Sequence, residues 1–302
     1  MKKIIAAAVA TAFVAPAFAA DVTVSGDVEF KYSKQKDNGI SQSLDGDSDF
    51  FITATEELGD GMAVKFVIGW EDVAAGGADA DTDSSAAPAN RVGDAELYIT
   101  GAFGSIGLGN VDDAVNTIDE YSHVAEDEGG TAIVAGATDN DHSAILWQLP
   151  TLVENLSVAA PARIENDSDT TADTEEMHTS YGLKYTMGSV AVTYGTLEID
   201  GADYSPTQVG VSYSNGPFFV AAEQVNEMGA STTDATTYGI TYDYGMGKFF
   251  YEDSSKDAAG TKTDVQIYGA SYKLGAVNLY LQNSSHTDNA SNKTTAGVEY
   301  AF

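Results

Sequence analysis

Hydrophobic and polar residues alternate with a period of two along much of the chain. In residues 21–34 the apolar side chains share one face: Val22, Val24, Val28, Phe30 and Tyr32. The positions between them are polar or charged, and residues 61–71, 181–187 and 238–244 repeat the pattern. Such alternation is typical of β-strands with one apolar and one polar face. A strand of a soluble sandwich shows the same pattern, so no single segment identifies the fold.

Sixteen segments of this kind can be placed along the chain. We expect strands at 22–34, 48–58, 61–71, 92–101, 104–110, 143–149, 155–165, 175–187, 189–199, 206–214, 217–227, 234–244, 246–254, 263–273, 276–284 and 292–302. Short connections carry turn-forming residues, as at 59–61, 187–189 and 214–217. Long connections are polar and acidic, as at 35–47, 71–90, 166–174 and 255–262. The two kinds alternate strictly, which is typical of a transmembrane barrel with short turns at one end and long loops at the other.

Residues 1–19 have the features of a cleaved bacterial secretory signal. Lys2 and Lys3 precede an apolar run that is too short to span a membrane. Ala17 and Ala19 are small residues of the kind that signal peptidase needs, which favours cleavage after Ala19. We therefore expect residues 20–302 to form the mature, folded chain.

The chain is strongly acidic. Its 46 Asp and Glu residues outnumber 14 Lys and Arg residues, and the formal net charge is −32 at pH 7. Binding to nucleic acid needs a basic surface, so this composition excludes such a partner. It also disfavours peripheral binding to anionic lipid. A soluble acidic protein fits the charge alone equally well.

Two absences in the sequence narrow the fold class. There is no Cys, which removes disulfide scaffolds and Cys-metal sites. No stretch after the leader approaches the roughly 18 apolar residues of a membrane helix. If the mature chain spans a membrane, it must do so as a closed barrel, because only that alternative pairs every backbone group without water. The predicted fold is therefore all-β, a 16-stranded antiparallel transmembrane β-barrel whose last strand, ending at Phe302, closes on the first.

Three short segments carry a resemblance to a known family. They are residues 104–114 (GSIGLGNVDDA), 55–61 (TEELGDG) and 142–150 (HSAILWQLP). In this order, and with the leader and terminal Phe302, they resemble the trimeric general porins of Gram-negative outer membranes, in particular the alphaproteobacterial type. The resemblance implies a homotrimer in outer-membrane lipid that forms a water-filled channel for passive diffusion of small hydrophilic solutes and ions. It also implies that the loop after the fifth strand folds inward and narrows the pore.

That loop, residues 111–142, is the longest connection in the chain. Loops of this length are usually functional or disordered. Its carboxylates are the candidate constriction residues: Asp112, Asp113, Asp119, Glu120, Glu126, Asp127 and Glu128. A solvated lumen can hold such charges where lipid cannot. The alternative is a floppy acidic loop outside the barrel.

Strand parity assigns charged residues to the opposing lumen wall. The candidates are Asp27, Glu29, Lys31, Asp49, Lys65, Asp94, Glu96, Arg163 and Lys184, with Arg91 near enough to a strand start to reach the pore or the loop. A Lys or Arg side chain facing lipid at mid-membrane would cost about 2–4 kcal/mol. Asp49 stands where the family often has a lumen-facing Arg. Carboxylates on both the loop and part of the wall predict a preference for cations.

Aromatic residues near strand ends form another group. We expect outward-facing girdles at the two membrane interfaces from Tyr185, Tyr194, Tyr213, Phe218, Tyr242, Tyr244, Phe250, Tyr272, Tyr300 and Phe302.

The sequence gives little support to an enzyme. The four His residues are scattered, and there is no Gly-x-Ser-x-Gly motif. No cofactor is required by this interpretation. Calcium is a secondary hypothesis, because Asp79, Asp81 and Asp83 lie at a spacing of two and Asp112 and Asp113 are adjacent. Solvated acidic loops explain the same residues.

Two other functions remain open within the barrel hypothesis. A substrate-specific channel would need an ordered aromatic or basic track along the lumen, and the sequence shows none. A surface-structural or adhesive barrel would have a plugged lumen. Small residues predicted to face inward argue against a filled interior: Gly182, Thr193, Gly239 and Thr241.

Overall fold

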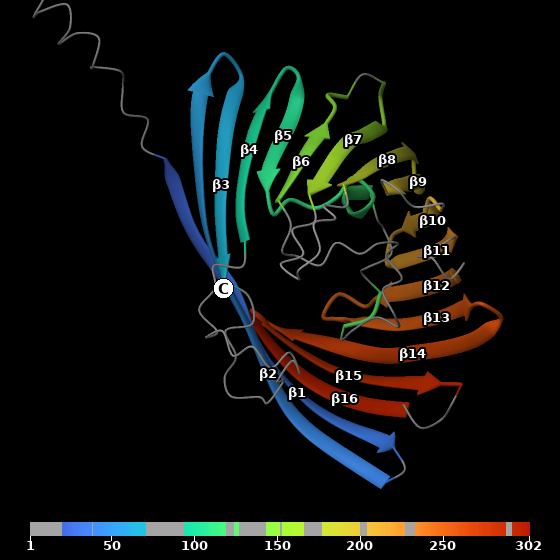
Figure 1. Cartoon of the computed structure of the whole chain (residues 1–302). Coiled ribbons are helices and arrows are strands. Elements are labelled where there is room, and N and C mark those ends of the chain that lie inside the picture. The colour runs from blue at the N-terminus through green and yellow to red at the C-terminus, as the bar shows by residue number, and fades with distance from the viewer. Residues whose placement is uncertain are drawn as a thin grey trace, which may run out of the picture.

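The computed structural model describes residues 20–37, 39–70, 94–118, 124–126, 143–151, 153–165, 177–199, 204–226, 233–287 and 292–302. These residues form a closed ring of strands (Figure 1). The strands are β1 (Asp21–Asp37), β2 (Gly39–Gly59), β3 (Met62–Trp70), β4 (Asp94–Gly101), β5 (Gly104–Gly109), β6 (Ser143–Gln148), β7 (Leu156–Glu165), β8 (Met177–Met187), β9 (Val190–Ile199), β10 (Thr207–Asn215), β11 (Phe218–Asn226), β12 (Thr233–Asp243), β13 (Lys248–Ala258), β14 (Thr261–Leu274), β15 (Val277–His286) and β16 (Asn292–Ala301). A short 3₁₀ helix, η1 (Asn116–Ile118), lies in the connection between β5 and β6.

Each strand pairs antiparallel with its neighbours in the chain, and β16 pairs with β1 to close the ring. In the closing pair Asp27 lies opposite Ala301. Phe302 extends the pair beyond β16, because its N–H donates to the carbonyl of Gly26 at 2.9 Å and its carbonyl accepts the N–H of Gly26 at 3.2 Å. The prediction of a 16-stranded antiparallel barrel closed by the C-terminal strand is confirmed. Among the described residues no helix is long and apolar enough to cross a membrane.

The two faces of the wall differ in chemistry. On β12, Tyr238 and Ile240 are exposed on the outer face, whereas Thr233 and Thr237 are buried on the inner face. The same division holds around the ring, with Val, Leu, Tyr and Phe side chains outside. A wall of this kind presents apolar side chains to lipid and leaves polar groups for the interior.

Two of the predicted long loops are wrong. Residues 35–37 belong to β1, which extends to Asp37, and residues 39–47 belong to β2, which starts at Gly39. Residues 255–262 belong to β13 and β14, joined by a tight turn at Ala259 (φ 51°) and Gly260 (φ 85°). Positive φ at both central residues matches the twist of a two-residue hairpin. Polar, acidic composition predicts a loop, yet a strand that continues beyond the lipid can be polar on both faces because its pairing depends on the backbone. Long and short connections therefore do not alternate strictly.

Candidate functional site

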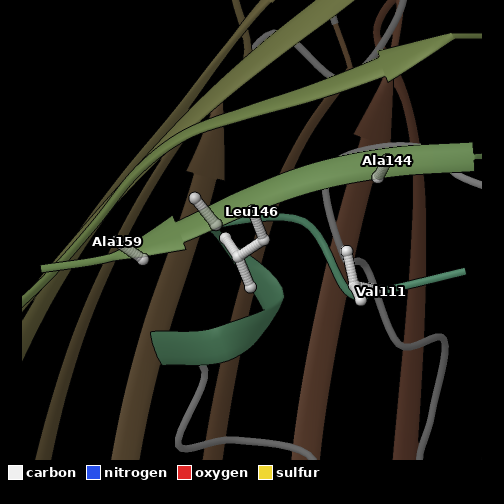
Figure 2. Packing of buried hydrophobic residues seen from close by; sticks show 5 residues of the cluster. Val111, Ala144, Leu146 and Ala159 are labelled. Atoms are coloured by element: carbon white, nitrogen blue, oxygen red, sulfur yellow. The ribbon is translucent and has the colours of Figure 1, made fainter. Parts of the chain in front are cut away.

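The first part of the β5–β6 connection lies against the inner face of β6 and β7. Val111 and Ala114 are buried against Ala144 and Leu146 of β6 and Ala159 of β7 (Figure 2). Outward-facing residues alternate with these on β6, because Ile145 and Trp147 are exposed on the other face. The inner wall is thus apolar at this place, and the connection covers it.

Two small residues of β8 and β9 let the same segment approach closely. The N–H of Ala114 donates to Oγ of Ser180 at 2.8 Å. A Cβ on Gly182 would collide with the carbonyl oxygen of Ala114, and a Cβ on Gly195 would lie 2.8 Å from Cγ1 of Val115. Any larger side chain at Gly182 would displace the segment, since the atom in the way is backbone. Figure 1 shows η1 beside these strands, inside the ring.

Asp113 organises the start of η1. Its Oδ1 accepts the N–H of Asn116 at 2.7 Å, as a helix-capping carboxylate does. The residue is 1% exposed, and burial raises the pKa of the Asp113 carboxyl to about 6. Neighbouring Asp112 acts in the same direction, while hydrogen bonds from the backbone of Asn116 and Val115 oppose it. The other oxygen, Oδ2, is buried without a hydrogen-bond partner among the residues described.

A second part of the same connection, residues 124–126, lies against a different stretch of wall. Val124 is fully buried in a cluster with Phe250, Val265 and Ile267 of β13 and β14. Phe250 therefore faces inward at 3% exposure, and its predicted place in an outer aromatic girdle is wrong. Phe249, 55% exposed, is the outward-facing residue of the pair. An apolar residue is favourable on the inward face of β13 and β14 at this position because Val124 packs on it.

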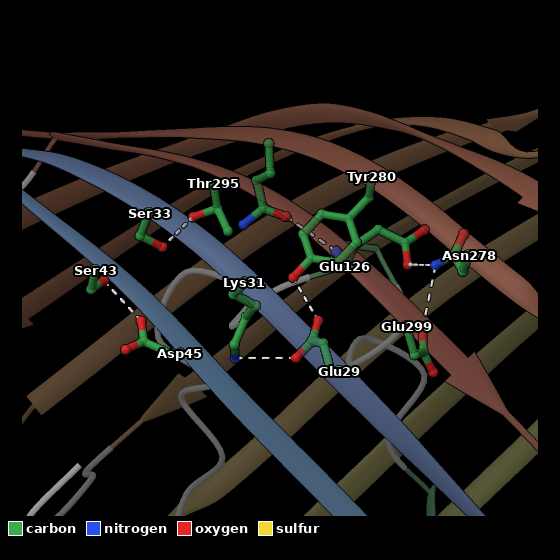
Figure 3. A network of polar contacts seen from close by, with 11 residues as sticks. Glu29, Lys31, Ser33, Ser43, Asp45, Glu126, Asn278, Tyr280, Thr295 and Glu299 are labelled. Atoms are coloured by element: carbon green, nitrogen blue, oxygen red, sulfur yellow. Dashed lines mark hydrogen bonds and ion pairs between the residues drawn. The ribbon is translucent and has the colours of Figure 1, made fainter. Parts of the chain in front are cut away.

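Glu126 stabilises this second contact through an ion pair and hydrogen bonds. Its Oε1 lies 3.3 Å from Nζ of Lys248, and its Oε2 accepts a hydrogen bond from Nδ2 of Asn278 at 2.9 Å. Its N–H donates to Oε1 of Gln282 at 3.2 Å. Nδ2 of Asn278 also donates to Oε2 of Glu299 at 3.4 Å, a contact drawn in Figure 3. One connection thus contacts the wall at β6–β9 and again at β13–β15.

Carboxylates gather on the inner face of β16, β1 and β2. Asp27 lies directly opposite Asp49, and Glu29 lies opposite both Asp47 and Glu299. All four neighbouring carboxylates act electrostatically on Asp27. Like charges on paired strands repel one another, so the arrangement is an energetic cost that the fold carries.

Three polar contacts offset part of that repulsion. Tyr280 of β15 donates its hydroxyl to Oε1 of Glu29 at 2.6 Å (Figure 3). Its ring crosses β16 over Gly297, where a Cβ would collide with it. Lys31 lies 3.3 Å from Glu29, and Asn278 donates to Glu299.

Basic residues on the inner face are more widely spread. Nζ of Lys65 lies over the ring of Tyr98 at 5.0 Å from its centroid. Lys184 lies on the inward side of β8, between exposed Leu183 and Tyr185. Glu96 of β4 is half-buried on the same face of its strand as Tyr98.

Several predicted site residues cannot be placed. Asp79, Asp81, Asp83, Arg91, Asp119, Glu120, Asp127 and Glu128 lie outside the described residues, as does the leader at residues 1–19. Asp94 and Arg163 lie in β4 and β7, but only their backbone is described. The pore roles assigned to all these residues, and the leader, stay predictions.

Sequence reasoning missed the wall partners of the loop. Six wall residues contact either the loop or the carboxylates of the inner wall: Ser180, Lys248, Asn278, Tyr280, Gln282 and Glu299. Glu299 alternates with the exposed Val298 and Tyr300, which places it on the inner face, but no local signal shows which loop residue a wall residue contacts. Asp47 lies in a segment whose composition predicts a loop, so sequence reasoning does not assign it to the wall.

The calcium hypothesis stays a prediction. Among the described side chains, no group of three or more His, Asp or Glu residues is arranged to hold a metal ion. Asp112 is exposed, and Asp113 uses one oxygen as a backbone cap.

Comparison with known proteins gives one family and a consistent fold. A family model described as Gram-negative porin matches residues 6–302. A multiply substituted porin of Rh. blastica is 16% identical, with a TM-score of 0.72 over 93% of this chain and 100% of that one. A loop-deletion mutant of OmpT, an outer membrane protein of Vibrio cholerae, is 15% identical, with a TM-score of 0.72 over 94% and 100%. A porin refined at 1.8 Å resolution is 18% identical, with a TM-score of 0.69 over 93% and 100%. The search of curated proteins gives no match.

The raised pKa of Asp113 predicts a pH-dependent contact. The folded state holds the proton up to about pH 6 and the unfolded segment only to about pH 4, so the contact weakens as pH rises between these values. The full cost, about 3 kcal/mol, is present above pH 6. Asp113→Asn keeps an oxygen for the N–H of Asn116 and removes the charge. At pH 7 its Ala114 amide should exchange hydrogen more slowly than in the wild type, with no such gain at pH 4. Titration of Asp113 near pH 4 by carboxyl ¹³C NMR would contradict this.

The ion pair of Glu126 predicts a local effect of Lys248→Gln. This change leaves a half-buried carboxylate without its cation, which costs about 1 kcal/mol and lowers amide protection at residues 124–126 about fivefold. Lys262→Gln is the matched control, because the pair of Lys262 with Asp264 is largely exposed. Equal protection in the two variants would show that the ion pair does not hold the segment.

Proposed function

The chain belongs to the Gram-negative porin family, and on that premise we propose that its channel prefers cations. Porins form outer-membrane channels through which small hydrophilic solutes diffuse passively. Family and barrel fold both indicate a channel rather than an enzyme. What the family does not fix is the charge preference, which depends on the side chains that line this particular lumen.

The acidic wall is the observation that carries the proposal. Asp27, Glu29, Asp47, Asp49 and Glu299 occupy one continuous stretch of the inner face, across β16, β1 and β2. Lys31 is the basic residue paired with this group, at Glu29. Carboxylates in a narrow, low-dielectric passage attract cations and repel anions, so their local concentrations differ from those of bulk solution. Glu126 adds a carboxylate from the loop, beside Glu299 through their shared donor Asn278.

We also propose that the β5–β6 connection forms the constriction. Two separate contacts support this: residues 111–118 lie on the inner face of β6–β9, and residues 124–126 lie on that of β13–β15. These two stretches of wall are separated by three strands, β10–β12, on one side of the ring. A connection held on both stretches reduces the open cross-section between them.

We propose two further features, a homotrimeric assembly and a calcium site. A homotrimer is the assembly implied by the family resemblance. Calcium at Asp112 and Asp113 is supported by the adjacency of the two carboxylates and by the unpartnered Oδ2 of Asp113.

Reversal potentials in a KCl gradient test the cation preference. The wild-type channel in a planar bilayer should pass potassium in preference to chloride. The double variant Asp27→Asn, Asp49→Asn should lower the permeability ratio about twofold or more, because it removes charge from the centre of the acidic wall. Asp60→Asn is a matched control in an exposed turn at φ 53°, a conformation that Asn adopts readily. A chloride preference in the wild type would overturn the proposal, and an equal shift in the control would assign the effect to overall charge.

Single-channel recording tests the trimer and the open lumen. A trimeric porin should insert as one unit whose conductance closes in three equal steps. Single-step closure would contradict the trimer. A bilayer that stays silent although folded protein has inserted would favour the plugged, adhesive barrel.

A further inference from the structure

A cavity of about 480 Å³ lies beside the turns that join β12 to β13 and β14 to β15, where Glu126 of the β5–β6 connection meets the wall. Its charged lining comes from Glu126 of the loop and from Asp243, Lys248, Lys273 and Glu299 of the wall. The turns at Gly245–Gly247 and Gly275–Ala276 border it. Its volume lies within the range of small-molecule sites, about 300–1,000 Å³. Unlike the acidic wall beside it, this cavity carries both signs of charge.

The charges are ordered by the strand register. Lys273 of β14 lies directly opposite Asn278 of β15, and Asn278 lies directly opposite Glu299 of β16. The cation and the carboxylate are therefore two strands apart, about 10 Å between backbones, with an amide between them. Both side chains are long enough to lean toward that amide. Lys248 lies on β13, the neighbour of β14, so both lysines lie on the same side of Asn278 in the strand order.

Asn278 lies at the centre of this row, and half of its amide has no partner. Its Nδ2 donates to Oε2 of Glu126 at 2.9 Å and to Oε2 of Glu299 at 3.4 Å. Its Oδ1 is buried and has no hydrogen-bond partner among the described residues. A buried acceptor without a donor is costly, and two carboxylates that share one donor repel each other. An ammonium group placed in the cavity beside this row would supply positive charge to both carboxylates.

We propose that this row is a binding site for small zwitterions of the α-amino-acid class. The ammonium group of the solute pairs with Glu299 and Glu126, which both line the cavity. Its carboxylate turns toward Lys273, which is exposed to the cavity, and toward Lys248. A metal cation or a simple amine would satisfy only the first half of the site, and an anion only the second. The inference rests on the proposed open channel and names a class of solute that it retains.

Block of the KCl current in planar bilayers tests the site in the intact channel. The probes are glycine, glycinamide and glycolamide, which are similar in size and carry both charges, the ammonium alone, and no charge. Glycine should reduce the current at a concentration about tenfold lower than either analogue, as expected for one additional charge-assisted hydrogen bond. Lys273→Gln should raise the half-blocking concentration of glycine about tenfold and leave that of glycinamide unchanged. Glu299→Gln should weaken both.

Lys262→Gln is the control, since it removes the same charge from an exposed hairpin at the other end of the barrel. The KCl conductance of each variant reports that the channel is folded. Equal block by glycine and glycolamide, or an unchanged half-blocking concentration of glycine in Lys273→Gln, would overturn the site. Glycinamide as effective as glycine would show a cation site instead and would overturn the zwitterion. The reversal potential of the same membranes is independent: chloride preference with intact glycine block would overturn the proposed selectivity and leave this site standing.

Discussion

The requirement that every backbone hydrogen bond be made without water governs this molecule. In lipid an unpaired N–H or C=O is too costly, so a sheet that spans the membrane must have no edge. Here the last open edge is removed by the pairing of β16 with β1, which the two hydrogen bonds between Gly26 and Phe302 continue to the final residue. Closure then fixes everything on the two faces. Once the ring exists, each strand position points either to lipid or to the interior, and a shift of one residue would exchange the two sets.

The interior that closure creates is where the chain departs from simple alternation. Most inner positions are polar, but Ala144, Leu146 and Ala159 form one apolar patch and Phe250, Val265 and Ile267 form another. Each is covered by part of the same loop, through Val111 and Ala114 at one and Val124 at the other. Apolar burial provides the affinity at both places, and directional contacts fix the position: Ser180 to the backbone of Ala114, and Lys248, Asn278 and Gln282 to Glu126. As in protein cores, apolar packing stabilises the loop and polar contacts fix its position.

The barrel was predictable from sequence because its main signal is local, whereas the contacts inside it were not. Alternation over a few residues located every strand. It also placed Asp27 and Glu29 on one face of the first strand and Val28 on the other face. It failed at residues 35–47 and 255–262, since beyond the lipid a strand needs no apolar face and its composition resembles that of a loop. It failed again at Phe249 and Phe250, where adjacent aromatic residues fit either parity and the choice depends on Val124, far away in the chain. Likewise, the contact between Asn278 and Glu126 depends on the position of the loop inside the barrel, which no local pattern predicts.

The crowded carboxylates of the inner wall set the proposed cation preference against the stability of the sheet. Separating the five carboxylates would lower their mutual repulsion, and neutral side chains would form the same sheet. These carboxylates are Asp27, Glu29, Asp47, Asp49 and Glu299. Among the contacts described, the repulsion is moderated by the hydroxyl of Tyr280, the amide of Asn278 and the ammonium group of Lys31. Dipolar donors lower the energy of a carboxylate while leaving its field in the passage, whereas a full set of salt bridges would cancel that field. Mobile cations from solution complete the compensation. Under the proposed cation preference, the ions that pass would also be the counterions, so the cost of crowding the carboxylates and the attraction of cations would have a single cause.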